Sequence, residues 1–588
     1  MSALLEKPAA PATVRGERRT SPGQAPAEEP LGAHRAISLV AVLGLFWPLL
    51  SAWGNIVAVP SGGIAVVALT GGAIWLLVAI ATARTEDGLA RLDRWLLALA
   101  LLVLGAWAAQ KLNGAAGYGT DEASFEQGAA NLLVHGHDPY GANLLPTLAQ
   151  FSTPTKYMTY TMTGGVVSTF GYPALPLLVV APFVELTGGG QAVPIADVFV
   201  LMVATVILYL QLPRAWRGLA VVLCVGYPIL ATFAFIGVNV IMATTALLVV
   251  AHRWTSVGES GRLTRGDGLR ALALGLALAT NQLAWFIAPF LLSGIFLARR
   301  AHLGSRPARR LTLGYLGIAV ATFAVINAPF FLWGPSAWLH GVAAPLTQHA
   351  IPYGQGIVGL TLFLRLGGGL LDAYNYAAGL LYVALLVLYV ARFRTLGRAA
   401  FALPLVALFF SGRSLAEYWL TLIAVVAISV ISADGPTIRS VPPLAALRRL
   451  SRPAQRVVAV GLFLPAAACL ALALGTPQPL TVRILVAHSS HLLRSVDRLR
   501  LLVHNNSEEP LQPHFATNVT GQAILWETTR GPKTLAPGSD AVYSLTAPDA
   551  SSMPANATPF VVEAVTGAPR TISSSQRFTQ PGQVPGYW

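Results

Sequence analysis

Long apolar segments, most of them roughly 15 to 23 residues, recur along residues 35–475 and are separated by short polar segments. A helix needs about 20 mostly apolar residues to cross the hydrocarbon core of a bilayer. The pattern therefore predicts a polytopic membrane domain over residues 35–475, with about 13 transmembrane helices. One apolar segment, residues 174–187, is short and ends in three glycines, so we expect it to lie at the membrane surface.

The pattern changes at both ends of the chain. Residues 476–588 contain short β-prone runs (VRILVA, RLRLLVHN, HFATNV, AVYSLTA and PFVVEAV) separated by turn residues, which predicts a β-sandwich of about six strands. Residues 1–34 are polar and rich in Ala and Pro, and we expect a disordered tail there. The expected fold class is an all-α polytopic membrane protein with a C-terminal β-sandwich domain.

The distribution of charge predicts how the chain is oriented in the membrane. The 588 residues are 54% hydrophobic and 11% charged, with a formal net charge of +14, whereas soluble domains carry about 25% charged residues. Residues 299–310 hold five Arg and no acid, and such clusters between apolar segments are typical of cytoplasmic loops. Nucleic-acid binding needs a basic face on a soluble surface, so the expected surroundings are a lipid bilayer and no nucleic acid. With an odd number of spans, a cytoplasmic N-terminus gives an extracytoplasmic C-terminal domain at the cell membrane.

A polar loop, residues 111–190, interrupts the apolar pattern and carries most of the candidate chemistry. Asp121 and Glu122 lie about ten residues past a predicted exit from the membrane. A carboxylate there is a candidate general base that deprotonates a sugar hydroxyl, and it also stabilises an oxocarbenium-like transition state. The same two acids suit the first turn of a helix capped by Thr120. The sequence leaves both interpretations open.

Other polar residues suggest a phosphate site and a cation site. Arg413, in SGRSLAEYW, is predicted at the outer face, where it suits bidentate phosphate binding. The alternative is an interfacial ion pair between Arg413 and Glu417. Arg365 and His349 are second candidates for the phosphate. The remaining polar group of the loop contains His135, His137 and Asp138, which either bind a divalent cation or form a polar turn closed by Pro139. No cofactor beyond this possible divalent cation is indicated.

Taken together, these motifs resemble those of a known superfamily. The acidic pair after an outward span, the segment AANLLVHGHDPYG, the Tyr172-Pro173 juxtamembrane segment and the late GRSLAEYW resemble GT-C integral membrane glycosyltransferases over about residues 95–432. The resemblance is to bacterial polyprenyl-phosphate-sugar-dependent mannosyl- and arabinosyltransferases of cell envelope biogenesis. The chain departs from many relatives by having two spans, rather than one, before the span that leads into the acidic loop.

The resemblance implies a reaction and a set of roles. The donor is a polyprenyl-phosphate sugar, and the acceptor is an envelope glycan or glycolipid on the outer face, which the C-terminal domain would help to bind. Asp121 is the base with Glu122 assisting, and Arg413 binds the donor phosphate. The expected contacts to the acceptor or donor sugar are His137, Asp138, Tyr140, Tyr172, Glu417 and Tyr418.

Two other classes of function remain to be weighed. A transporter or lipid flippase would explain the polar pair Asn281-Gln282 and Pro289 within an apolar segment, because transporters have broken helices with polar sites at mid-membrane. A non-catalytic scaffold that presents the C-terminal domain would leave the acidic loop and Arg413 without a purpose.

Overall fold

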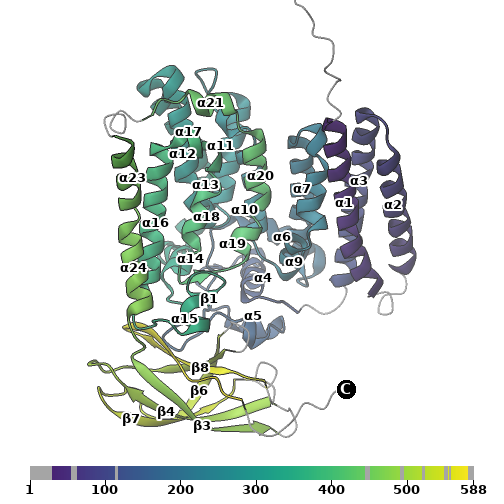
Figure 1. Ribbon diagram of the computed structural model, residues 1–588. Coiled ribbons are helices and arrows are strands. Elements are labelled where there is room, and N and C mark those ends of the chain that lie inside the picture. The colour runs from purple at the N-terminus through teal and green to yellow at the C-terminus, as the bar shows by residue number, and fades with distance from the viewer. Residues whose placement is uncertain are drawn as a thin grey trace, which may run out of the picture.

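The computed structural model describes residues 29–54, 62–112, 117–443, 451–490, 495–518, 523–548, 554 and 558–579. Most of them are helical, and a C-terminal β domain lies at one end of the helices (Figure 1). The helices of the first half are α1 Glu29–Gly54, α2 Gly63–Thr82, α3 Glu86–Lys111, α4 Asp121–Val134, α5 Leu145–Gln150, α6 Leu175–Thr187, α7 Ala192–Gln211, α8 Gly218–Val221, α9 Ile229–Ile236, α10 Val240–Ala251 and α11 Arg265–Leu278. Those of the second half are α12 Leu283–Leu303, α13 Ser305–Trp333, α14 Pro335–Thr347, α15 Gly359–Leu364, α16 Asp372–Ala391, α17 Phe393–Leu396, α18 Leu403–Leu408, α19 Glu417–Leu420, α20 Ile423–Ser432, α21 Gly435–Ser440, α23 Arg452–Gly461 and α24 Leu464–Gly475.

The prediction of a membrane protein is confirmed at the level of apolar helices. Within the described residues, eight helices are long and apolar enough to cross a bilayer. A ninth is obtained if the pair Arg214–Gly226 and Ile229–Ile236, bent by 43°, counts as one span. Three shorter apolar helices, Leu175–Thr187, Val240–Ala251 and Glu417–Ser432, fall below that length. The number of about 13 spans therefore stays a prediction.

The predicted N-terminal tail overlaps the first helix. Helix α1 begins at Glu29, so the expected boundary at residue 34 falls inside it. Residues 1–28, which make up the rest of that tail, lie outside the described residues.

The two ends of the helical part differ in what they carry. Helices α4, α5 and α15 lie at the end next to the β domain, whereas α17 and α21 lie at the opposite end (Figure 1). The C-terminal domain therefore lies at the same end of the helical part as the polar loop, which contains the acidic pair. This agrees with the relative placement that the sequence predicts for these two parts.

The C-terminal strands form one continuous antiparallel sheet in the order β3-β4-β7-β6-β5-β8-β9. An apolar cluster that includes Leu501, Phe515, Tyr543 and Val562 forms its core. The two ends of the sheet meet, because the backbone N–H of Leu480 in β3 donates to the Ser573 hydroxyl in β9 at 3.0 Å. The described strands are β3 Leu480–Ser490, β4 Ser495–Asn505, β5 His514–Asn518, β6 Ala523–Arg530, β7 Asp540–Thr546, β8 Val561–Gly567 and β9 Arg570–Ser574.

This β domain packs firmly against the loops that connect the helices. The N–H of Ile572 donates to the Gly368 carbonyl at 2.8 Å, and the N–H of Leu371 donates to the Arg570 carbonyl at 3.2 Å. Arg570 also forms an ion pair with Asp372 at the start of α16. A shared apolar cluster joins residues of both parts, among them Tyr160, Met162, Tyr374, Ala516, Val565 and Ile572. The β domain is thus part of the same packed body as these loops.

Candidate active site

The acidic pair opens helix α4 as the capping interpretation predicts. The Thr120 side chain accepts a hydrogen bond from the Ala123 N–H at 3.1 Å, and its hydroxyl donates to the Ile236 carbonyl at 3.1 Å. The cap therefore starts α4 and also attaches it to the end of α9. Asp121 and Glu122 occupy the first turn, where the helix dipole favours negative charge. The same turn faces a cavity, so capping and a chemical role are compatible.

That cavity has a volume of about 740 Å³, within the range of small-molecule sites. It is bounded by the polar loop, by the segments that precede α15 and α19, by helices α9, α12 and α16, and by the edge of the β domain. The sequence-predicted residues that line it are Asp121, Glu122, Tyr172, His349, Arg413, Glu417 and Tyr418. Residues far apart in the sequence are therefore brought to one space, as an active site requires.

Asp121 is held by the chain that folds back over it. The backbone N–H of Thr159 donates to Asp121 Oδ2 at 2.6 Å. Burial raises the pKa of Asp121, while the hydrogen bonds from Thr159 and the positive charge of Arg413 oppose that rise. A carboxylate in this setting keeps enough basicity to accept a proton and is fixed in direction.

Glu122 differs from its neighbour in its electrostatic surroundings. Burial, and then negative charge on the neighbouring carboxyls of Glu126 and Glu417 when these are ionised, raises the pKa of Glu122 well above its ordinary value. The N–H of Asn239 donates to Glu122 Oε1 at 3.1 Å. Because the pKa of Glu122 is raised more than that of Asp121, Asp121 loses its proton at the lower pH. Asp121 is therefore better suited than Glu122 to act as the base.

Arg413 is positioned by a small parallel pairing that the sequence did not indicate. Strand β1, Tyr353–Gly354, pairs with β2, Arg413–Ser414, in the register Tyr353↔Arg413. The N–H of Gln355 donates to the Ser414 carbonyl at 2.8 Å, which extends the pairing. Gly354 makes it possible, since its φ is +118° and a Cβ there would lie 2.0 Å from the Ser414 oxygen.

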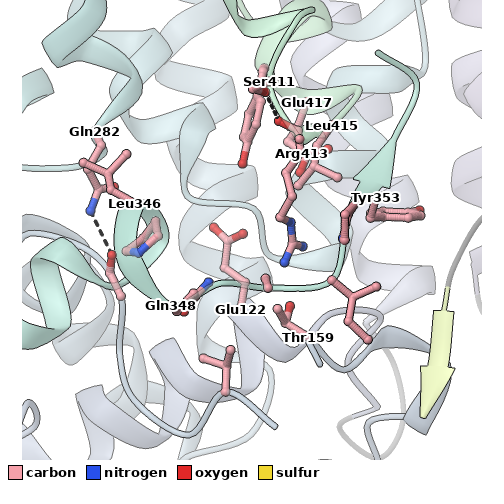
Figure 2. Close-up of a pocket in the computed structure, with 18 of the residues that line it drawn as sticks. Glu122, Thr159, Gln282, Leu346, Gln348, Tyr353, Ser411, Arg413, Leu415 and Glu417 are labelled. Atoms are coloured by element: carbon pink, nitrogen blue, oxygen red, sulfur yellow. Dashed lines mark hydrogen bonds between the residues drawn. The ribbon is translucent and has the colours of Figure 1, made fainter. Parts of the chain in front are cut away.

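The Arg413 guanidinium points into the cavity toward the Glu122 side, as Figure 2 shows. Among the described residues, no carboxylate forms an ion pair with it. The alternative of an interfacial pair with Glu417 is therefore not seen. An arginine that faces a cavity in this way is available to a bound anion.

The other predicted residues that line the cavity are His349, Tyr172, Glu417 and Tyr418. His349 adopts a left-handed backbone conformation, with φ +49°, and its pKa is lowered by partial burial and by the charge of Arg570. Tyr172 lies beside Glu122, and Glu417 and Tyr418 line the same cavity.

Four predicted residues lie elsewhere. Arg365 ends helix α15 with φ +60° and does not line the cavity. Asp138 Oδ1 accepts the Tyr140 N–H at 2.9 Å, and the Tyr140 hydroxyl donates to the Tyr172 carbonyl at 2.7 Å, so both stabilise the loop. His137 is exposed. In the part of the chain that the structure describes, no group of three or more His, Cys, Asp or Glu is placed to bind a metal ion. The hydrogen bond from the Tyr140 N–H to Asp138 agrees with the turn interpretation.

Sequence reasoning missed several polar residues of the cavity, among them Gln348, Asn375 and Arg570. Arg570 comes from β9, and nothing in the sequence connects that strand with the acidic loop. Asn375 holds the β2 segment, because its Oδ1 accepts the Gly412 N–H at 3.1 Å. The sequence offered one indication that Asn375 lines a site, namely that it is a polar residue in the first turn of an apolar helix.

Comparisons with known proteins give no match: no family model, no curated protein and no solved structure matches this chain.

Proposed function

We propose that this protein is a membrane glycosyltransferase that moves a sugar from a polyprenyl-phosphate donor to a hydroxyl of an envelope glycan or glycolipid. The observation that carries the proposal is a single cavity that holds both the fixed carboxyl of Asp121 and the guanidinium of Arg413. Asp121 takes the proton of the acceptor hydroxyl, and the oxygen attacks the anomeric carbon. The bond from that carbon to the phosphate oxygen breaks, and Arg413 binds the polyprenyl phosphate that leaves.

The character of the cavity supports an amphiphilic donor. Its polar lining includes Asp121, Glu122 and Arg413, and much of its remaining lining is apolar and comes from helices that include candidate spans. The apolar lining includes Phe233, Ile236, Val240, Leu283 and Phe286. A carrier lipid with a phosphate head group needs both kinds of surface in one site.

We also propose the finer architecture that this function requires. The helical part is GT-C-like with about 13 spans, in which the shorter apolar helices join the long ones. The N-terminus is cytoplasmic, and the C-terminal domain, interpreted as a β-sandwich, lies outside the cell membrane beside the acceptor. The positive charge of the opposite end, at Arg392, Arg394 and Arg398, supports this orientation.

The test is a transfer assay with purified protein in lipid nanodiscs, a panel of radiolabelled polyprenyl-phospho-sugars and crude envelope glycan. We expect transfer from one donor, and a loss on the order of 10²- to 10⁴-fold in Asp121→Asn, because a general base contributes that much. Asp138→Asn is the matched control, since this acid of the same loop lies outside the cavity. Turnover of Asp121→Asn at the wild-type rate would remove the base assignment.

A lipid flippase is the second candidate, because an amphiphilic cavity also suits a lipid that is being translocated. The polar pair that suggested transport lines this cavity, but its side-chain amides donate their hydrogen bonds to groups of the protein. Gln282 Nε2 donates to the carbonyls of Gly171 and Val342 at 2.9 and 2.8 Å, and Asn281 Nδ2 donates to Asn239 Oδ1 at 2.9 Å. Movement of labelled lipid across proteoliposomes, without sugar transfer from any donor, would favour the flippase.

A further inference from the structure

Behind the acidic pair lies a fully buried group of polar side chains. Glu126 is one turn after Glu122 on α4, Asp197 belongs to α7, and Asn239 immediately precedes α10. All three have no exposed surface. They lie where α4, α7 and the turn before α10 pack together.

Asn239 uses each of its polar groups in this contact. Its backbone N–H donates to Glu122 Oε1 at 3.1 Å, and its Nδ2 donates to Glu126 Oε2 at 3.3 Å. Its Oδ1 accepts from Asn281 Nδ2 at 2.9 Å, and Asn281 in turn accepts the Leu283 N–H at 2.9 Å. The acceptor role toward Asn281 fixes the amide so that its donor end faces Glu126.

The chain approaches α4 closely at this point. Gly237, two residues before Asn239, has φ +75°, and a Cβ there would lie 2.6 Å from the Ala123 Cβ. The turn between α9 and α10 therefore rests directly on the first turn of α4. This contact delivers the Asn239 N–H to Glu122, and the side-chain bonds of Asn239 keep the turn in place.

The carboxyls behind Glu122 have no compensating charge. In the described part of the chain, Glu126 Oε1 and both oxygens of Asp197 have no hydrogen-bond partner, and neither residue forms an ion pair. A buried carboxylate without a partner is strongly unfavourable. Burial raises the pKa of Glu126 to about 8, so at neutral pH this residue is mostly protonated.

We propose that Asn239 is a positioning residue, which anchors on a neutral Glu126 and thereby holds the Glu122 carboxyl in the cavity beside Asp121. This inference rests on the proposed transferase function. Asn239 and Glu126 do not line the cavity, so they act through Glu122 rather than on the substrate. The neutral state of Glu126 matters because a second charge behind Glu122 would suppress ionisation of the acidic pair.

The first test separates the shape of this contact from its charge. Glu126→Gln keeps an oxygen that accepts from Asn239, and we expect kcat within about twofold of wild type. Glu126→Leu removes the acceptor and leaves the buried Asn239 Nδ2 without a hydrogen-bond partner. We expect its kcat to fall on the order of 10- to 100-fold, with an unchanged KM for the polyprenyl-phosphate sugar. If Glu126→Gln is as impaired as Glu126→Leu, the proton of Glu126 is itself required and the anchor role is wrong.

The second test uses the pH profile. The titratable and charged groups around Glu122 are Asp121 and Glu126 on α4, Asp197 on α7, Tyr172, Arg413, Glu417 and Tyr418. Asn239→Asp places two carboxyls in contact that share one proton, so we expect the acidic limb of kcat/KM to move to higher pH. The exchanged pair Asn239→Asp with Glu126→Gln again has one carboxyl and one amide, and the limb should return. An unmoved limb in the single variant, or no return in the pair, contradicts the proposal.

A third measurement does not need turnover. The infrared difference spectrum between wild type and Glu126→Gln at neutral pH should contain the band of a protonated carboxyl. A carboxylate band in its place would show that Glu126 is charged and would overturn the proposal. If the wild type transfers no sugar from any donor, the proposed function fails, whereas the infrared comparison still decides the state of Glu126.

Discussion

At the scale of single residues, partners distinguish two arginines that the sequence treated as candidates for one task. Arg413 faces the cavity without an ion pair in the described structure, whereas Arg365 ends a short helix outside it. A guanidinium at a cavity wall with no carboxylate partner carries a charge that a phosphate is able to neutralise. The environment of each side chain, and not its residue type, therefore separates Arg413 from Arg365.

This contrast gives a prediction with a built-in control. Arg413→Ala should raise KM for the polyprenyl-phosphate donor on the order of 10- to 100-fold, because a charge-assisted hydrogen bond contributes about 1.5–3 kcal/mol. Arg365→Ala should leave KM near the wild-type value. The measurement is a donor titration in the transfer assay at fixed acceptor. An equal effect of the two substitutions would contradict a phosphate role for Arg413.

At the scale of elements, short irregular segments place the site more than the long helices do. The pairing of β1 with β2 aims Arg413, and the turn at Gly237 brings α10 against α4. Each depends on a glycine, Gly354 or Gly237, at which an added Cβ would meet the backbone or the Cβ of a neighbouring residue. A larger residue at either position would destabilise the contact, because protein interiors are close-packed.

Gly237→Ala tests the closeness of the turn to α4. Its Cβ would meet Ala123 at 2.6 Å, so we expect a loss of stability of about 1–3 kcal/mol, together with a lower kcat. Gly136→Ala is the matched control, because Gly136 has the same φ of +75° and nothing within 4 Å of its Cβ. Thermal unfolding and transfer rates of both variants are compared. Equal destabilisation of the two would mean that only the backbone conformation matters.

At the scale of the whole molecule, the cavity is shared between the helical part and the β domain. Ala523 and Arg570 of the β domain line it, and Arg570 pairs with Asp372 at the start of α16. The C-terminal domain therefore acts as a wall of the site and not only as a tethered module. Its position beside the polar loop requires that both lie on one side of the membrane (Figure 1).

Sidedness is checked by labelling single cysteines in intact cells, after Cys224 and Cys469 are replaced by alanine. His137→Cys in the polar loop and Lys533→Cys in the β domain should react with a membrane-impermeant thiol reagent. Arg394→Cys, at the opposite end, should react only after the membrane is permeabilised. Labelling of Arg394→Cys in intact cells, or protection of His137→Cys, would reverse the proposed orientation.

The sequence by itself determined the membrane class, the β-prone C-terminal part and the first turn of α4, because apolar runs, strand alternation and a Thr cap are local patterns. It also selected Asp121, Glu122 and Arg413, since charge is conspicuous in an apolar chain. Only the tertiary structure decided that these three share a cavity with Arg570, and that Asn239 holds Glu122. It also showed that His137, Asp138 and Tyr140 lie outside that cavity. Such contacts join residues more than a hundred positions apart, and no local pattern records which distant segments pack together.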